Sequence, residues 1–224
     1  MVYKIMNSKF RVFLESVIIS LLILIIGFSI GIYVESKRTE KVVENYKNYE
    51  IEALDLKLQN YYYQIMDRSS CDEAIEQNFK FADDIYLRGL ELEKYEEISQ
   101  ISEELSREKK RYSLLKTELW LNTILLKEKC DAEFDTVTYL YAGEPTNSAT
   151  VSKQKIISNV LKTVKEDKGN KVVLLPIAGD LGLNSVNLQM RIYKVKSLPS
   201  IVINEDIVLE GFHTAEQIIS YLEH

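Results

Sequence analysis

The chain opens with one long apolar run before its pattern of apolar and polar residues changes. Residues 16–34, SVIISLLILIIGFSIGIYV, contain no charged residue and lie between Glu15 and Glu35. At ~1.5 Å per residue, a helix of this length reaches about 28 Å, close to the ~30 Å hydrocarbon core of a membrane. The run therefore predicts a transmembrane helix that contacts membrane lipid through residues 16–34.

A cleaved signal peptide is the alternative explanation for this run. The apolar region of a signal peptide is usually ~7–15 residues long and ends at small residues. The run here is longer, and Gly31-Ile32-Tyr33-Val34 is a poor cleavage site. We therefore favour a retained anchor.

Residues 36–130 have the spacing of amphipathic helices, with no proline between 36 and 129 and Gly89 as the only glycine. Apolar residues recur every three or four positions, as one face of a helix requires. The first helix carries Val42, Tyr46, Tyr49, Ala53, Leu56 and Tyr63, and the face is widened by Val43, Leu54, Leu58, Tyr61 and Ile65. Two more helices follow a break at 68–70. We interpret 36–130 as an α-helical stalk or hairpin, whose first helix also favours a coiled-coil homodimer.

From residue 131 onwards, short apolar runs alternate with helical patterns. Strands are expected at 135–141, 171–177, 200–203 and 207–209, and helices at 151–165, 184–193 and 214–222, with Thr150 as the cap of the first. The order β-α-β-α-β-β-α predicts an α/β domain with a covered sheet. The chain is thus expected to contain a cytoplasmic N-terminus (1–15), a transmembrane helix (16–34), the helical region (36–130) and an α/β domain (131–224).

Composition and charge exclude several functions. The 224 residues carry a net charge of −6, and no stripe of Lys and Arg interleaved with aromatics is present, so nucleic acid is not an expected partner. No glycine-rich phosphate loop or other catalytic motif occurs. His213 and His224 lack further metal ligands nearby in sequence. We therefore predict no cofactor, no metal and no catalytic residue.

The two cysteines, Cys71 and Cys130, lie in the helical region. If the second and third helices form an antiparallel hairpin, a bridge between these cysteines places the turn near residue 100. The segment 99–102, Ser-Gln-Ile-Ser, is the softest part of the run. We expect a structural disulfide, with two separate buried thiols or a redox-active pair as the alternatives.

Membrane orientation is nearly balanced by the basic residues alone. Lys4, Lys9 and Arg11 precede the span, and three more basic residues follow it by residue 41. A cysteine pair suits an oxidising compartment. We therefore expect the N-terminus in the cytoplasm and the C-terminal ~190 residues outside it.

One string in the α/β domain resembles thioredoxin. Tyr193-Lys-Val-Lys-Ser-Leu-Pro199-Ser-Ile-Val-Ile-Asn is similar to that family's helix end, valine and strand-opening proline, and Gly211 matches its glycine after the hairpin. The resemblance implies a cis Leu198-Pro199 bond and a peptide-binding loop formed by Leu198, Pro199 and Ser200. The layout is also similar to prokaryotic, often archaeal, membrane-anchored thioredoxin-like proteins.

The sequence departs from that family where its two active-site cysteines would stand. The matching turn, 142–149, holds Glu144, Pro145, Thr146, Asn147 and Ser148 and no thiol, so it is a degenerate active-site loop. The isolated domain 131–224 is expected to fold alone without redox activity.

Three functions remain open at the level of sequence. One is a non-catalytic module that binds an unidentified extracytoplasmic protein near Pro199 by strand-like pairing. The second is a thiol-disulfide oxidoreductase or redox chaperone that uses Cys71 and Cys130. The third is a structural or oligomeric stalk.

Overall fold

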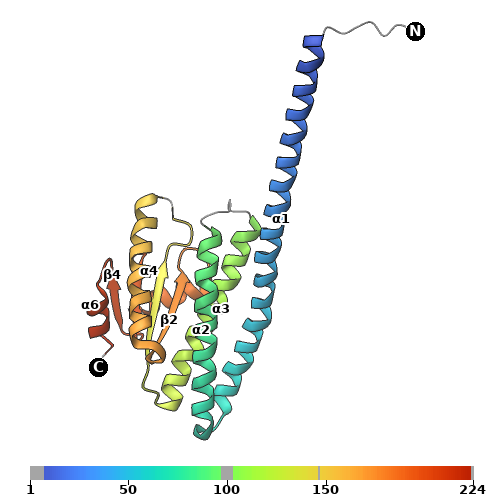
Figure 1. Ribbon diagram of the computed structural model, residues 1–224. Coiled ribbons are helices and arrows are strands. Elements are labelled where there is room, and N and C mark those ends of the chain that lie inside the picture. Colours follow the sequence, from blue (N-terminus) through green and yellow to red (C-terminus); the bar gives the residue numbers. More distant parts are fainter. Residues whose placement is uncertain (1–7, 97–102, 146, 223–224) are drawn as a thin grey trace. The chain divides into compact units, whose positions relative to one another are not determined.

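The computed structural model describes residues 8–96, 103–145 and 147–222. The contacts divide the chain into two units, residues 1–45 and 46–224. The helices are α1 (Ser8–Ile65), α2 (Cys71–Glu96), α3 (Glu103–Cys130), α4 (Ser148–Lys168), α5 (Asn184–Ile192) and α6 (Ala215–Ser220), with short 3₁₀ turns at Arg68–Ser70 and Gly169–Lys171 (Figure 1). The strands are β1 (Asp135–Tyr141), β2 (Val172–Ala178), β3 (Ser200–Ile203) and β4 (Ile207–Glu210). The α/β fold class and its element order are confirmed.

In the first unit, the segment Arg11–Lys37 of α1 has a mean hydropathy of 2.8 and is long and apolar enough to cross a membrane. All its side chains are exposed, as those of a lipid-facing helix would be. Gly27 and Gly31 leave a shallow hollow on the helix between Leu24 and Phe28. The expectation of a helix of spanning length is confirmed.

In the second unit, α2 and α3 form an antiparallel pair. Asn78 Nδ2 on α2 donates to Thr123 Oγ1 on α3 at 3.0 Å, and Tyr112 Oη on α3 donates to the Ile85 carbonyl on α2 at 2.6 Å. Because the partner number falls on one helix as it rises on the other, the two helices run in opposite directions. The turn expected at 99–102 lies outside the described residues.

The end of α1 packs on α2 and α3 through one face of the helix. Leu56 and Tyr63 are almost fully buried. Between them, Asn60 Nδ2 donates to Asn122 Oδ1 at 2.6 Å, and Asn122 Nδ2 donates to the Leu56 carbonyl at 2.9 Å. Leu58, which the sequence analysis placed on the same widened stripe, is instead exposed. The apolar residues of this helix therefore form two faces.

The four strands have the order β2-β1-β3-β4, with β1 parallel to β2 and antiparallel to β3, and β3 antiparallel to β4. Alternate strand residues pack under α4 and α6 on one face of the sheet. This core contains Val137, Tyr139, Val172, Leu174, Ile201, Ile203 and Leu209 from the strands and Ile157, Leu161, Val164, Ile218 and Leu222 from the helical side.

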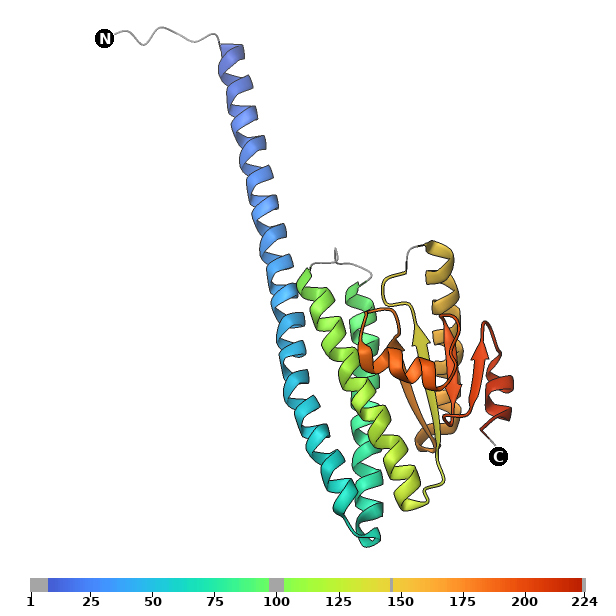
Figure 2. The ribbon, with the colours of Figure 1, turned by 180° about the vertical axis from the view of Figure 1, so that it is seen from behind.

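The opposite face of the sheet lies under α3 and α5, which Figure 2 shows side by side. Side chains that point this way are also buried, because successive strand residues face opposite sides. They include Leu140, Val173, Leu175, Ile177 and Val202. Trp120 of α3 is 1% exposed, and its ring centroid lies 5.2 Å from that of Tyr193, the residue that follows α5, with the two rings tilted by 36°. Helix α3 therefore shares a core with the sheet.

The start of α4 differs from the sequence expectation. The helix begins at Ser148, and its cap is Asn147, whose Oδ1 accepts from the Thr150 amide at 2.8 Å. Thr150 lies inside the first turn and is not the cap. Asn and Thr are both common at the N-cap of a helix, so the sequence alone did not distinguish Asn147 from Thr150.

Candidate functional site

The strand register gathers four chain segments at one edge of the sheet. Leu140 pairs with Ser200, Ser200 pairs with Glu210, and Tyr141 pairs with Ala178. The ends of β1, β2 and β4 therefore meet the start of β3. We call the residues beyond these ends the Pro199 edge; they are 142–145, 179–183, 197–199 and 211–213.

The Leu198-Pro199 peptide bond at this edge is cis, as the thioredoxin resemblance implied. Pro199 is buried, and Leu198 is half-buried. Ser200 is 1% exposed, and its Oγ donates to the Ser197 carbonyl at 2.6 Å. Of the three predicted residues, Leu198 therefore offers side-chain surface to a ligand, whereas Ser200 braces the turn.

Two side chains hold the backbone of the loop 142–145. Gln154 of α4 accepts from the Ala142 amide at 2.9 Å and donates to the Ala142 carbonyl at 3.0 Å. Asp180 Oδ1 accepts from the Gly143 amide at 2.7 Å. Because these amides already have protein partners, they are not available to stabilise an anionic group on a substrate.

The loop also lies too close to the end of β2 to take a larger residue at Gly143. A Cβ atom at this position would lie 2.8 Å from the Ala178 Cβ and 3.2 Å from Leu181 Cδ2. A thiol side chain here would need the backbone to move. Glu144 and Asn147 are exposed beside it, whereas Thr146 lies outside the described residues.

Phe212 and His213 complete this edge and were not singled out by the sequence analysis as part of it. Phe212 is 55% exposed. His213 Nδ1 is buried with no hydrogen-bond partner in the part of the chain that the structure describes. The signal that could have found them is the position of both residues directly after Gly211, which the thioredoxin resemblance had already placed at the end of the hairpin.

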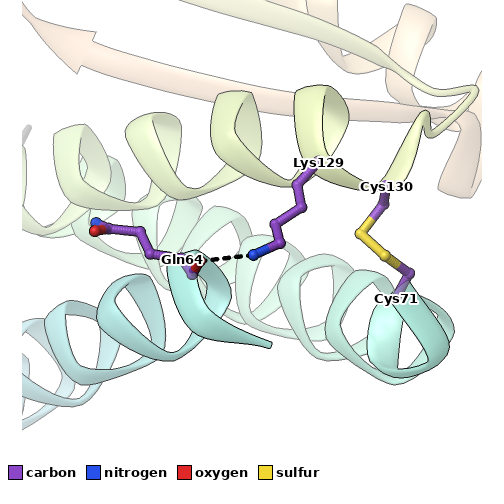
Figure 3. The surroundings of a disulfide bond; sticks show 4 residues. All are labelled: Gln64, Cys71, Lys129 and Cys130. Carbon is purple, nitrogen blue, oxygen red and sulfur yellow. Dashed lines mark hydrogen bonds between the residues drawn. A yellow bond between two sulfur atoms is a disulfide. The ribbon is translucent and has the colours of Figure 1, made fainter. Parts of the chain in front are cut away.

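The cysteines form the expected disulfide, which joins the start of α2 to the end of α3. Cys71 and Cys130 are bonded with a Cα–Cα distance of 5.6 Å. Cys71 is 8% exposed and packs with Tyr63 and Leu126. Beside the bond, Lys129 Nζ donates to the Gln64 carbonyl at 2.7 Å, so the end of α1 is tied to the same place (Figure 3).

The disulfide and the Pro199 edge lie at opposite ends of β1. Cys130 precedes the first residue of β1, Asp135, by five positions, whereas the Pro199 edge follows its last residue, Tyr141. A strand of this length spans about 20 Å. A substrate held at Pro199 would therefore not reach the sulfur atoms without a large rearrangement. In the described part of the chain, no group of three or more His, Cys, Asp or Glu side chains could hold a metal ion.

The fold and its edge define an α/β domain with a four-stranded mixed sheet and no cysteine in residues 131–224. No protein-family model and no curated protein matches the chain. Among solved structures, one described as a malarial protein shares 18% identity, covers 40% of this chain and 94% of its own, and has a TM-score of 0.32. Chloroplastic thioredoxin z shares 20% identity, covers 44% of this chain and 83% of its own, and has a TM-score of 0.33.

Proposed function

We propose that this protein is a membrane-anchored, extracytoplasmic thioredoxin-like module that binds a protein partner at the Pro199 edge and performs no dithiol chemistry there. The observation that carries the proposal is the construction of this edge. The segments 142–145, 179–183 and 211–213 meet at the edge that holds Leu198, and Phe212 in the last of them is exposed.

The chemistry of the edge favours binding over reaction. The amides of Ala142 and Gly143 are bonded to Gln154 and Asp180, so the loop is held in place without a ligand. An exposed aromatic ring on a fixed scaffold is a common anchor for a polypeptide. The partner's chain would lie across Leu198, with an apolar side chain against Phe212.

Two features support the proposed location of the protein, the apolar helix and the disulfide. The segment Arg11–Lys37 of α1 is long enough to cross a membrane. Disulfides persist in oxidising compartments and are rare in the cytosol. A Cys71–Cys130 bond therefore supports placing residues 46–224 outside the cytoplasm, with the N-terminus inside.

A redox role for the cysteine pair has weaker support. The length of β1, about 20 Å, separates the disulfide from the Pro199 edge, and Cys71 is buried in an apolar cluster. Thiol-disulfide exchange needs access for an attacking thiolate. A structural role, in which the bond ties two helix ends together, fits these contacts better.

Site-specific photocrosslinking in native membranes tests the binding surface. A photoreactive phenylalanine analogue at Phe212 should give a discrete adduct with one protein. The matched control is the same analogue at Ile156, which lies on α4 and is 53% exposed against 55% for Phe212. Equal labelling from both positions, or none from Phe212, would contradict the proposal.

Protease added to intact cells tests the orientation separately. An extracytoplasmic location predicts digestion of residues 46–224 from outside, with a short membrane-embedded N-terminal fragment left. Digestion only after lysis would place the domain in the cytoplasm and overturn this part of the proposal.

A further inference from the structure

Outside the apolar span, the outward face of α1 in the second unit carries six exposed apolar side chains at helical spacing. Its members are Ile51, Leu54, Leu58, Tyr61, Tyr62 and Ile65, which are 71%, 60%, 59%, 55%, 54% and 81% exposed. The buried face, with Leu56 and Tyr63, is taken by α2 and α3. Figures 1 and 2 show no other described element on the outward side of this segment.

The spacing of the outward face indicates what kind of surface would cover it. Residues 51, 54, 58, 61 and 65 are separated by three, four, three and four positions, which is the a/d repeat of a coiled coil. The a positions are Ile51, Leu58 and Ile65, and the d positions are Leu54 and Tyr61. A β-branched residue at a with leucine at d favours two parallel strands, and Ile51 and Ile65 at a with Leu54 at d follow this rule.

We propose that residues 51–65 of α1 form a parallel, two-stranded coiled coil with the same residues of a second copy of this chain. In a coiled coil, each a or d side chain inserts between side chains of the facing helix, so it needs a matching heptad stripe there. A second copy supplies an identical stripe. Residues three and four apart keep a narrow seam along the helix, and the same helix of a second copy offers a seam of equal width.

The exposed area is large enough for such a pair. Taking roughly 150–200 Å² for a large apolar side chain, the exposed fractions leave roughly 600 Å² per copy. If all of this area is covered, two copies bury at most roughly 1,200 Å², against about 1,000 Å² expected of a specific interface. In a parallel, in-register pair, Lys57 of one copy meets the Tyr62 ring of the second copy, and the like charges Glu50 and Asp55 meet at the N-terminal end of the seam.

The parallel direction rests on the membrane anchor proposed above, whereas the pairing does not. Two copies anchored in one membrane by the same helix enter it in the same direction, so their α1 helices run parallel. Confinement to a membrane also raises the effective concentration of one copy around another.

Disulfide crosslinking of single cysteine variants tests the seam in the full chain purified in detergent. Both native cysteines are bonded to each other, so an introduced cysteine is the one free thiol. Leu58→Cys should form a disulfide-linked dimer at least tenfold faster than Leu87→Cys, a matched control on α2 with 60% exposure. Ile51→Cys should crosslink to Ile51→Cys of a second copy, and Ile65→Cys to Ile65→Cys, because only a parallel pair brings identical positions together at both ends.

The mass of the unlinked protein in detergent gives the second measurement. The natural chain should be a dimer, and Leu58→Glu should raise its dissociation constant at least tenfold, whereas Leu87→Glu should not. A monomer at all concentrations, or a dimer that Leu58→Glu leaves intact, would overturn the proposal. Crosslinking only between Ile51→Cys and Ile65→Cys in a mixture would make the pair antiparallel and overturn its direction.

The two proposals can fail separately. If the photoreactive analogue at Phe212 gives no adduct while the dimer is intact, the proposed binding function fails and the pairing stands.

Discussion

The indole Nε1 of Trp120 donates a hydrogen bond to Glu205 Oε1 at 2.9 Å. Trp120 is on α3, and Glu205 is in the turn between β3 and β4, 85 residues later. The same carboxylate oxygen accepts from Thr136 Oγ1 at 2.6 Å. Next to it, Asn204 Oδ1 accepts from Lys127 Nζ at 2.9 Å. The hairpin turn is therefore held by both the first strand and the helical region.

Replacing Trp120 with Phe keeps an aromatic ring in the core and removes the donor. The hydrogen bond to a carboxylate and part of the ring volume are lost, so the free energy of unfolding should fall by about 2–3 kcal/mol. Denaturant unfolding of the full chain in detergent measures this. Leu114→Ala, at an exposed position of the same helix, should change stability by less than about 0.5 kcal/mol.

The fragment 131–224 should not fold into a well-packed domain, contrary to our expectation from sequence. Removing α3 would expose the buried Leu140, Val173 and Leu175 on one sheet face. We expect poor dispersion of amide resonances and binding of a hydrophobic dye, which are signs of lost packing. The fragment 46–224, which keeps α2 and α3, should give a dispersed spectrum. A dispersed spectrum from 131–224 as well would contradict the shared core.

Cys71→Ser should lower the free energy of unfolding. Because the bond closes a loop with a sequence separation of 59, the chain-entropy model gives a loss of about 4 kcal/mol. Reduction of the natural protein should produce the same loss in a denaturant titration. Ser69→Ala, at an exposed neighbouring position, is the control and should leave the midpoint unchanged.

The full chain should not catalyse disulfide exchange. Residues 142–149 hold no thiol, and Cys71 is buried beside Tyr63. Insulin reduction in the presence of dithiothreitol should proceed at the rate seen with the Cys71→Ser, Cys130→Ser double variant. A rate for the natural protein several-fold above that of the double variant would revive the oxidoreductase hypothesis.

Stability should fall at high pH partly through Tyr63. Burial, with a smaller contribution from the charge of Asp55, raises the pKa of Tyr63 to about 12 from its ordinary value near 10. The folded state therefore keeps a proton that the unfolded state has lost. This contribution is fully present below pH 10 and is lost as the pH rises towards 12. Tyr63→Phe should flatten the fall in unfolding midpoint in this window, whereas Tyr62→Phe, at an exposed position, should not.

Several features of the fold could be predicted because they depend on local pattern. Strands β1 and β3 have the residues expected from alternation and apolar runs. The disulfide followed from the antiparallel geometry of two helices and the positions of Cys71 and Cys130. The site was predicted in part, because the string around Pro199 identified one segment of the edge, whereas Phe212 reaches that edge only through the pairing of Ser200 with Glu210.

The sequence by itself determined the apolar span, the order of the elements and the absence of a thiol in the loop after β1, because each is written in consecutive residues. Tertiary structure decided which apolar residues of α1 are buried. Leu56 and Leu58 are equally apolar, and only the position of α2 and α3 leaves one inside and the other exposed. It also decided that α3 belongs to the core of the sheet, since the Trp120–Glu205 contact joins residues whose separation along the chain carries no local signal.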